Sequence, residues 1–330
     1  MIIVPNLNLI TQFKSDMIEY GFDTDMLGEV WSNQKEWDKK VVISTWQSLA
    51  KVDEQLSYFD GFIVDEVHSA AALVLRDTIA KMTNAQYRFG CTGTLSDDDL
   101  DDFNVRSYLG PVFKQYSAKY LKEHGYLVDC QINQILLHYN SKFKGDFHKV
   151  KDEIFKNEFR MSLIKDKLSS VKSNLILMLV NKVEDEGQYF LDYLRSFDEF
   201  KDYEIQFISG KTKKDEREYW RQEAIKNDRK IILIATYPVF QAGINIPGLD
   251  TVFFLSPTKS KIRLLQSIGR SLRLYNKNDF TKEKAYIYDF VDDQNKWFEK
   301  HSEIRERHYD NNDFNIYTEE FWEKSYKSII

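Results

Sequence analysis

The sequence predicts an α/β protein with two parallel-sheet domains in tandem. Short apolar runs rich in β-branched residues alternate with helical patterns, and this alternation occurs in two series along the chain. A mostly charged helical stretch separates the two series. The length of 330 residues agrees with two domains, because a single domain commonly has about 150 residues.

The first series contains four runs that are predicted to be buried strands. They are MIIVP, KVVIST, FDGFIVDE and YRFGCTGT, which begin at residues 1, 40, 59 and 87. Helical patterns between them include Leu9 to Tyr20 and Ala70 to Met82. Each run ends in polar or small residues, and open α/β sheets bind ligands at the carboxyl ends of their strands. We therefore expect functional residues at the ends of these runs.

The remaining domain boundaries follow from changes in pattern. A short helical stretch, YSAKYLKEHGYL, precedes an apolar run, DCQINQILLHY, and we assign residues 1–140 to the first domain. The charged helical segment after it is predicted to be a linker, residues 141–172. A second domain over residues 173–292 is predicted from SNLILMLV, YEIQFIS, KIILIAT, DTVFFLS and KAYIYDF. The charged and aromatic residues 293–330 are predicted to form one or two packed helices.

The composition excludes several classes of protein. Hydrophobic residues make up 42% of the chain and aromatic residues 15%, which argues against disorder. No apolar run reaches the ~18 residues of a membrane span, and the first residues lack the basic region of a signal peptide. We therefore expect a soluble, cytoplasmic protein. Cys91 and Cys130 match neither a disulfide framework nor a metal-ligand spacing.

The net charge of −6 does not by itself indicate binding to nucleic acid. Basic residues cluster, however, because the stretch from Lys259 to Arg273 contains no acid, whereas the stretch from Ser96 to Phe103 is mostly acidic. Local clusters decide nucleic-acid binding more than net charge does. The charge therefore leaves this class of function open.

An acidic pair follows one predicted strand in FIVDEVH, Phe62 to His68. A carboxylate at the end of a strand, here Asp65, can hold Mg²⁺ through water. Its neighbour Glu66 can act as a base toward an attacking water, with His68 two residues further on. The same letters also fit a strand that ends in two acids before a helix, where acids are favoured anyway.

A second turn, GCTGTL from Gly90 to Leu95, follows the next predicted strand. The hydroxyl groups of Thr92 and Thr94 can couple the end of this strand to the acidic pair by hydrogen bonds. By itself, the turn also fits an ordinary connection after a strand.

A basic helix is predicted in the second half from QSIGRSLR. Spacings of three and four residues place Gln266, Gly269, Arg270 and Arg273 on one helical face. Two arginines on one face suit bidentate contact with a phosphoryl group, and a solvated basic face is the alternative. Just upstream, ATYPVFQAGINIP places Thr236 at the end of a strand and Gly243 at a turn.

Together these stretches resemble the motifs of superfamily 2 helicases. DEVH is similar to the Walker B box, TGT to motif III, ATYPVFQAGINIP to motif V and QSIGRSLR to motif VI. IIVPNLNLITQF, from residue 2, resembles motif Ia, and VVISTWQSL, from residue 41, resembles motif Ib. The six motifs occur in the order of the family. The chain resembles in particular the recombination and repair helicases of T4-type phages.

The resemblance implies two RecA-like domains that hold ATP and Mg²⁺ and bind DNA, with RNA as the other possibility. It implies that Asp65 holds Mg²⁺ through water and that Glu66 activates water. The catalytic residues implied are Asp65, Glu66, His68, Gln266, Arg270 and Arg273, and those at the nucleotide are Asp65, Gly243, Arg270 and Arg273. The residues implied for nucleic-acid binding or coupling are Pro5, Thr45, Gln47, Thr92, Thr94, Gly210 and Thr236.

One stretch, SGKT from Ser209 to Thr212, has the last letters of a phosphate-binding loop. A complete loop needs a glycine where Ile205 stands, and the stretch follows a strand of the second half. We predict a strand-to-helix turn that contacts nucleic acid. No G-x-x-x-x-G-K-[ST] sequence occurs in the 330 residues, so we expect a first domain that is truncated at its N-terminus.

Two explanations of the absent loop stay open. In the first, which we favour because Met1 falls inside a motif, the chain is the C-terminal part of a longer helicase. In the second, another polypeptide supplies the loop. The resulting hypothesis is an ATP-dependent DNA helicase or translocase that acts on branched DNA and is inactive in ATP hydrolysis as this chain alone. The alternative is a nucleic-acid-binding or partner-binding fragment without ATPase activity. The motor subunit of a restriction enzyme has the same architecture, but it needs a nuclease or methylase domain.

Overall fold

The computed structural model describes residues 1–69, 72–93, 95, 98–226, 228–243, 246–256, 260–277, 280–294 and 296–326. The chain divides into two compact units, Met1–Gln115 and Tyr116–Ile330. Within the described ranges, no helix has the length and apolar character to cross a membrane.

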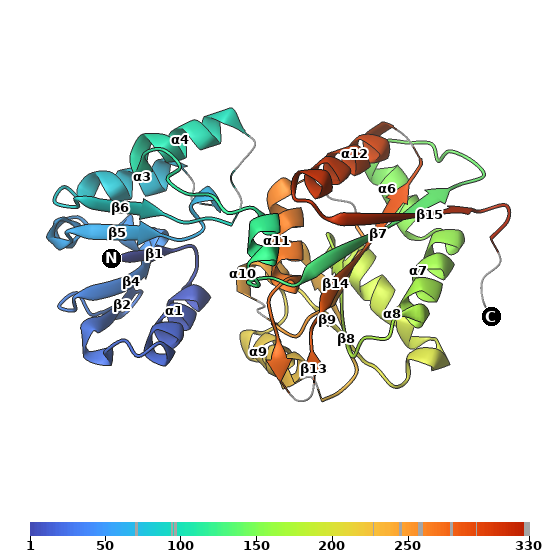
Figure 1. Cartoon of the computed structure of the whole chain (residues 1–330), viewed down its shortest axis with the longest axis horizontal. Coiled ribbons are helices and arrows are strands. Elements are labelled where there is room, and N and C mark those ends of the chain that lie inside the picture. Colours follow the sequence, from blue (N-terminus) through green and yellow to red (C-terminus); the bar gives the residue numbers. More distant parts are fainter. Residues whose placement is uncertain are drawn as a thin grey trace. The chain divides into compact units, whose positions relative to one another are not determined.

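Unit 1 is a mostly parallel sheet whose described strands have the order β3-β2-β4-β1-β5-β6 (Figure 1). Only β2 and β3 pair antiparallel among these strands. The strands are β1 (Ile2–Val4), β2 (Leu27–Trp31), β3 (Gln34–Lys35), β4 (Val41–Thr45), β5 (Gly61–Val64) and β6 (Tyr87–Gly90). The four runs predicted as strands in the first half are therefore confirmed as β1, β4, β5 and β6.

Helices cover the two faces of this sheet unequally. On one face, α1 (Leu7–Glu19) packs Ile10 against Val4 and Ile43. The other face packs Phe62 and other buried side chains against α2 (Trp46–Leu49), α3 (Ala72–Lys81) and α4 (Asp99–Leu109). Short 3₁₀ helices complete the unit, at η1 (Thr24–Met26), η2 (Glu54–Tyr58) and η3 (Val67–Ser69).

Strand β6 corrects one prediction, because it is exposed along its whole length instead of buried. It lies at the edge of the sheet, with Tyr87 64% exposed and Phe89 57% exposed. Register pairs Tyr87 with Gly61 and Phe89 with Ile63, so these side chains share one face with Ile63, which is 43% exposed. Helix α1 packs on β1, β2 and β4 of that face and leaves these three side chains in water.

Unit 2 is a second sheet, in which the described strands have the order β15-β7-β14-β11-β8-β10-β9 and all pair parallel. They are β7 (Asp129–His138), β8 (Leu175–Val180), β9 (Glu204–Ile208), β10 (Ile231–Thr236), β11 (Thr251–Phe254), β14 (Lys284–Asp292) and β15 (Asn315–Trp322). In a separate two-stranded sheet, β12 (Asn276–Lys277) pairs antiparallel with β13 (Phe280–Thr281). The central strands β8, β10 and β11 are buried at every residue, as parallel strands covered on both faces are.

Helices cover both faces of this second sheet. One face packs against α9 (Lys214–Lys226), α10 (Tyr237–Gly243), α11 (Lys261–Ser271) and α12 (Lys296–Asn311). The opposite face packs against α7 (Glu158–Ser170) and α8 (Tyr189–Arg195). Further short elements are α5 (Ala118–Glu123), α6 (Phe147–Phe155), the π-helical turn η4 (Val183–Gln188) and η5 (Asp198–Phe200).

The predicted domain boundary at residue 140 is wrong. Strand β7, which we expected in the first domain, pairs with β14 and β15 of the second sheet along its whole length. Its apolar residues Cys130 and Ile132 are fully buried in the core of unit 2. The division between the units therefore lies at Gln115 and Tyr116.

The segment 141–172 is helical as predicted, but it is not a linker. Side chains of α6 and α7, among them Phe155, Leu163 and Ile164, are buried against the second sheet. Arg160 of α7 is 1% exposed, with its Nε 2.9 Å from Oδ1 of Asp292 at the end of β14. Because segment 141–172 packs apolar side chains on the sheet and is joined to it by a buried ion pair, it is part of the second domain.

The last segment also differs from its prediction, because its described residues, 293–294 and 296–326, contain a helix and then a strand. Helix α12 buries Tyr309, whose hydroxyl donates to Oδ2 of Asp289 at 2.8 Å. Strand β15 then pairs with β7, from Asn315–Gln131 to Trp322–His138. The segment thus supplies the edge strand of the second sheet.

Candidate functional site

The acidic pair lies at the carboxyl ends of two adjacent parallel strands in unit 1. Asp65 and Glu66 follow β5, and Cys91 and Thr92 follow β6, in a register that pairs Val64 with Gly90. Backbone hydrogen bonds extend the ladder beyond the strands, from the Cys91 N–H to the Val64 carbonyl at 2.8 Å. Because neighbouring strands end at the same edge, the two turns that the sequence pointed to lie together.

A chain of side-chain contacts links these two turns through His68. Its Nδ1 lies 2.6 Å from Oγ1 of Thr92 and 3.3 Å from Oε2 of Glu66. Burial lowers the pKa of His68, which favours the neutral ring. The expected coupling between a threonine hydroxyl and the acidic pair therefore has a geometric route, with an imidazole between them. Thr94 lies outside the described residues.

The backbone at Glu66 has a φ of +49°, in the left-handed region that few side chains adopt. This conformation turns the chain directly after β5. Such a backbone persists where neighbouring contacts hold it, and it is common at functional sites. Here the contact with His68 is one of those that hold the Glu66 side chain.

The neighbouring Asp65 carboxyl is half-buried, and burial raises its pKa, an effect that the Glu66 backbone N–H reduces by hydrogen bonding. Within the described ranges, no three His, Cys, Asp or Glu side chains cluster as metal ligands. Mg²⁺ in nucleotide sites commonly takes one or two carboxylates, with waters and phosphates as its other ligands. A single strand-end carboxylate therefore fits the water-mediated contact that we expected for Asp65.

Three candidates for nucleic-acid contact lie at the ends of β1 and β4, which are neighbours in the same sheet. Thr45 caps α2, with its hydroxyl oxygen accepting the Ser48 N–H at 3.3 Å. The Gln47 side chain donates to the Pro5 carbonyl at 3.3 Å and is exposed. The structure thus brings Pro5, Thr45 and Gln47 together, and assigns Thr45 a local role as a helix cap.

In unit 2, the SGKT stretch is a turn between β9 and α9, as predicted. The Ser209 N–H donates to Oγ1 of Thr212 at 3.0 Å, and the Lys211 N–H donates to Oγ of Ser209 at 3.2 Å. In a phosphate-binding loop, backbone N–H groups point at the phosphate. Here the hydroxyl oxygens of Thr212 and Ser209 accept hydrogen bonds from two such N–H groups instead. Gly210 is exposed in the middle of this turn.

The motif V candidates flank α10. Thr236 is the last residue of β10 and is only 4% exposed, and Gly243 is the last residue of α10. Thr236 lies at the carboxyl edge of the second sheet, like the SGKT turn. The residues directly after Gly243 lie outside the described ranges.

Helix α11 carries the arginine motif, and here the structure corrects one placement. Gln266, Gly269 and Arg270 lie on the helix, which ends at Ser271 with Leu272 as its cap, so Arg273 is outside it. Arg273 instead forms an antiparallel bridge with Leu127, and the Val128 N–H donates to the Leu272 carbonyl at 2.9 Å. The guanidinium of Arg270 lies 5.6 Å from the ring centre of Phe240 on α10, which joins motifs V and VI by a cation–π contact.

Comparisons with known proteins agree with this arrangement. A family model described as the res subunit of type III restriction enzymes matches residues 1–97, and one described as the helicase conserved C-terminal domain matches residues 157–275. The ATP-dependent DNA helicase UvsW of Enterobacteria phage T4 is 29% identical over 309 residues, 88% of this chain and 59% of the relative. The chain belongs to superfamily 2 of the helicases.

Two further matches define how far the comparison reaches. A putative ATP-dependent RNA helicase of Acanthamoeba polyphaga mimivirus is 24% identical over 316 residues, 91% of this chain and 57% of the relative. The chain thus spans less than two thirds of either relative. A fragment of a putative HsdR subunit of a type I restriction enzyme from Vibrio vulnificus, 15% identical, matches with a TM-score of 0.67 over 97% of this chain and 57% of that one. The two sheets are the tandem RecA-like domains of the superfamily.

The sequence reasoning missed one buried carboxylate in the helicase, at the carboxyl edge of the second sheet. Glu186 is 1% exposed and accepts hydrogen bonds from Nζ of Lys151 at 2.5 Å, from the backbone N–H of Asn181 at 2.8 Å and from Oγ of Ser256. Burial opposes ionisation, but these partners outweigh it and lower the pKa of Glu186. The structural feature that marks this site is the π-helical turn that carries Glu186. The sequence gives no comparable signal, because Glu186 is one acid in a charged stretch.

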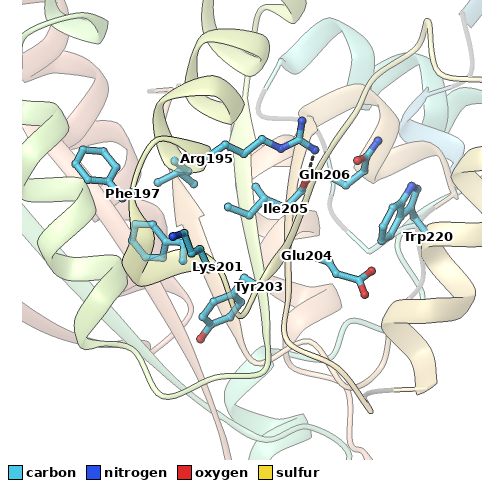
Figure 2. Close-up of a pocket in the computed structure, with 10 residues that line it drawn as sticks. Arg195, Phe197, Lys201, Tyr203, Glu204, Ile205, Gln206 and Trp220 are labelled. Carbon is cyan, nitrogen blue, oxygen red and sulfur yellow. Dashed lines mark hydrogen bonds between the residues drawn. The ribbon is translucent and has the colours of Figure 1, made fainter.

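A cavity of about 380 Å³ in unit 2 holds none of the predicted residues (Figure 2). It lies beside the edge strand β9, between the end of α8 and Trp220 of α9. The Arg195 side chain lines it and donates to the Ile205 carbonyl at 2.8 Å. This contact occupies an outward-facing group of an edge strand, which limits pairing with other chains.

Proposed function

We propose that the chain is the motor of an ATP-dependent DNA helicase or translocase. The observation that carries this proposal is the contact chain from Glu66 through His68 to Thr92, at the carboxyl ends of two adjacent strands. A nucleotide-driven motor requires a general base in contact with groups that respond to hydrolysis. The reason is that a change at the nucleotide must alter the residues that hold the nucleic acid.

In unit 1, Glu66 accepts a proton from the attacking water, and neutral His68 orients its carboxylate. Asp65 would hold Mg²⁺ through water, and the ion would supply positive charge beside the phosphates. Thr92 meets His68 at 2.6 Å, so a change at Glu66 alters the turn after β6. Each of these roles uses a group that already lies at one edge of the sheet.

In unit 2, Arg270 and Arg273 stabilise charge on the transferred phosphoryl group, with Gln266 assisting. The Arg270 guanidinium lies over the Phe240 ring. The N–H groups of a guanidinium point outward in its own plane, and this is the direction from which they bind phosphoryl oxygens. Gly243 allows close approach of the chain after α10 to the nucleotide.

We propose DNA as the nucleic acid because the T4 relative, at 29% identity, is a DNA helicase. RNA is the other possibility, because the mimivirus relative, at 24% identity, is a putative RNA helicase. Pro5, Thr45, Gln47, Gly210 and Thr236 are the proposed contacts or coupling residues. By analogy with the phage relative, we propose branched DNA in recombination and repair as the substrate and the host cytoplasm as the place of action.

The phosphates of ATP are held, in this proposal, by a strand, loop and helix outside the 330 residues, from a preceding segment or a second chain. The edge strand β6 supports it, because Tyr87 and Phe89 are exposed and a parallel neighbour would end beside Thr92. The sheet face at Ile63 offers apolar surface for the helix of that segment. Hydrogen exchange tests this directly, since the added segment should slow exchange of the β6 amides.

The test of the function is DNA-stimulated ATP hydrolysis by the purified chain, with and without that segment. Glu66→Gln should lower kcat by about 10²- to 10⁴-fold and leave nucleotide affinity largely intact. Glu19→Gln at the exposed end of α1 is the matched control, and Arg270→Ala should also abolish turnover. Undiminished turnover in Glu66→Gln removes Glu66 from the role of base. Salt-sensitive DNA binding without turnover in any preparation would favour the alternative, a binding fragment.

A further inference from the structure

The turn after β11 is held by buried polar groups to which the proposed function assigns no role. Leu255 and Ser256 form this turn and are the last residues described before Ser260, the N-cap of α11. Their backbone N–H groups both donate to the Leu179 carbonyl of β8, at 3.1 and 3.3 Å. The position of this turn therefore bears on the position of α11, the helix that carries Arg270.

The side chain of this turn binds the buried Glu186 carboxylate. Oγ of Ser256 donates to Oε2 of Glu186. The same oxygen accepts the backbone N–H groups of Asn181 and Lys182, at 2.8 and 3.1 Å. Nζ of Lys151 donates to Oε1 at 2.5 Å. One carboxylate thus joins α6, the turn after β8 and the turn after β11.

Stability gives no sufficient reason for this arrangement. Lys151 and Glu186 are 7% and 1% exposed, and removing two charges from water is costly. Apolar side chains of similar volume often stabilise a core as well as a buried ion pair does. A fully hydrogen-bonded polar network instead makes its part of the core rigid, because each donor has one position relative to the acceptor. The network therefore suits the fixing of a position.

The same turn is joined to α10 through Tyr237, the first residue of that helix. The Tyr237 hydroxyl donates to the Ser256 carbonyl at 3.2 Å. Burial raises the pKa of Tyr237, so the hydroxyl keeps its proton and remains a donor. Three residues further along α10, the fully buried Phe240 ring lies 5.6 Å from the guanidinium of Arg270. A line of contacts thus runs from the buried carboxylate to the arginine.

We propose that Glu186 and Tyr237 are positioning residues for Arg270. The proposal rests on the proposed function, in which Arg270 stabilises charge on the transferred phosphoryl group. Glu186 fixes Ser256, the Ser256 carbonyl fixes the start of α10, and α10 presents the Phe240 ring to Arg270. A misplacement of about 1 Å at a reacting group can lower a rate by about 10²-fold, so rigidity has a large effect at this arginine.

The first experiment follows the Nε–Hε signal of Arg270 by NMR in the whole chain, without ATP. The Phe240 ring shifts this signal because the guanidinium lies over it, and Arg270→Lys identifies the signal by its loss. Tyr237→Phe removes one hydroxyl, keeps the ring and should move the signal. Tyr203→Phe is the matched control, because the Tyr203 hydroxyl donates to the Ser173 carbonyl at 2.9 Å at the opposite edge of the sheet. This control should leave the signal in place.

A double variant tests the carboxylate itself. Lys151→Met together with Glu186→Leu removes both charges, so no unpaired charge stays buried. It should move the Arg270 signal as Tyr237→Phe does. If urea-induced unfolding shows that the double variant is not folded, Tyr237→Phe decides the question. An Arg270 signal that stays in place in a folded variant would overturn the proposal.

The second experiment measures ATP hydrolysis by the same variants together with the segment that supplies the phosphate-binding loop. Tyr237→Phe should lower kcat by about 10- to 100-fold and leave the KM for ATP unchanged, whereas Tyr203→Phe should change neither. Unchanged kcat in Tyr237→Phe, with an active wild type, would overturn the positioning role and leave the motor intact. A moved Arg270 signal without hydrolysis by any preparation would support the positioning of Arg270 and count against the motor.

Discussion

The two units contain the same kind of strand and bury it very differently. Phe253 on β11 is fully buried, and its ring stacks 4.4 Å from that of Tyr288 on the neighbouring strand. Phe89 on β6 is 57% exposed, although it also lies in a strand of a parallel sheet. The difference teaches that burial depends on the neighbours of a strand. β11 has strands on both sides and helices on both faces, whereas β6 has one strand and an open face.

The most direct way to break this comparison is to remove the same side chain from both strands. Phe253→Ala should lower the free energy of unfolding of unit 2 by about 3–5 kcal/mol, because it leaves a cavity in a filled core. Phe89→Ala should change that of unit 1 by less than about 1 kcal/mol, because the ring already contacts water. Hydrogen exchange followed by mass spectrometry measures the two units separately. Equal losses would show that β6 is buried in solution.

A second prediction concerns a buried cation of unit 2. Lys282 is 3% exposed, and burial lowers its pKa from 10.5 to about 8, with Arg273 contributing and Asp250 opposing. Between about pH 8 and 10.5 the unfolded chain binds this proton and the folded chain does not. The free energy of unfolding should therefore rise with pH in this window, by up to about 3 kcal/mol.

Urea-induced unfolding at several pH values measures this effect. Lys282→Met should remove the rise, whereas Lys284→Met, two residues further on and about one third exposed, should keep it. A wild-type curve that is parallel to that of Lys282→Met would contradict the shifted pKa.

The smallest effect is expected at the acidic pair of unit 1. Burial raises the pKa of Asp65, so the folded state binds its proton more tightly than the unfolded state does. Unit 1 should therefore lose stability as the pH rises from about 4 through the folded pKa. Asp65→Asn should remove this loss and raise the free energy of unfolding at pH 7 slightly, because the half-buried carboxylate is no longer ionised in the fold.

Thermal unfolding at pH 4 and pH 7 measures the gain, with Asp60→Asn, an exposed carboxyl just before β5, as the control. The same variant should lose Mg²⁺-dependent ATP hydrolysis, so that stability and activity change in opposite directions. A loss of stability at pH 7 would show that the Asp65 carboxylate is held by contacts that outweigh its burial.

Sequence reasoning located most of the candidate site because strand-end motifs are local. An apolar run that ends in Asp65 and Glu66 indicates both a strand and its polar end, and the same holds for the run before Thr92. The sequence could not predict that His68 joins these two turns, because this contact depends on β5 and β6 being neighbours in the sheet. Arg273 shows the opposite failure, because the helical spacing continues past Ser271 but the helix does not.

The sequence by itself determined the α/β class, the positions of most strands and the order of the helicase motifs. These features depend on patterns within about ten residues, where the alternation of apolar runs and polar ends is visible. Only the tertiary structure decided that β7 belongs to the second sheet, that segment 141–172 covers it and that β6 is open to water. The physical reason is that strand pairing joins residues far apart in the chain. Asp129–His138 has the same local pattern in either sheet, and only its partners β14 and β15 make the choice.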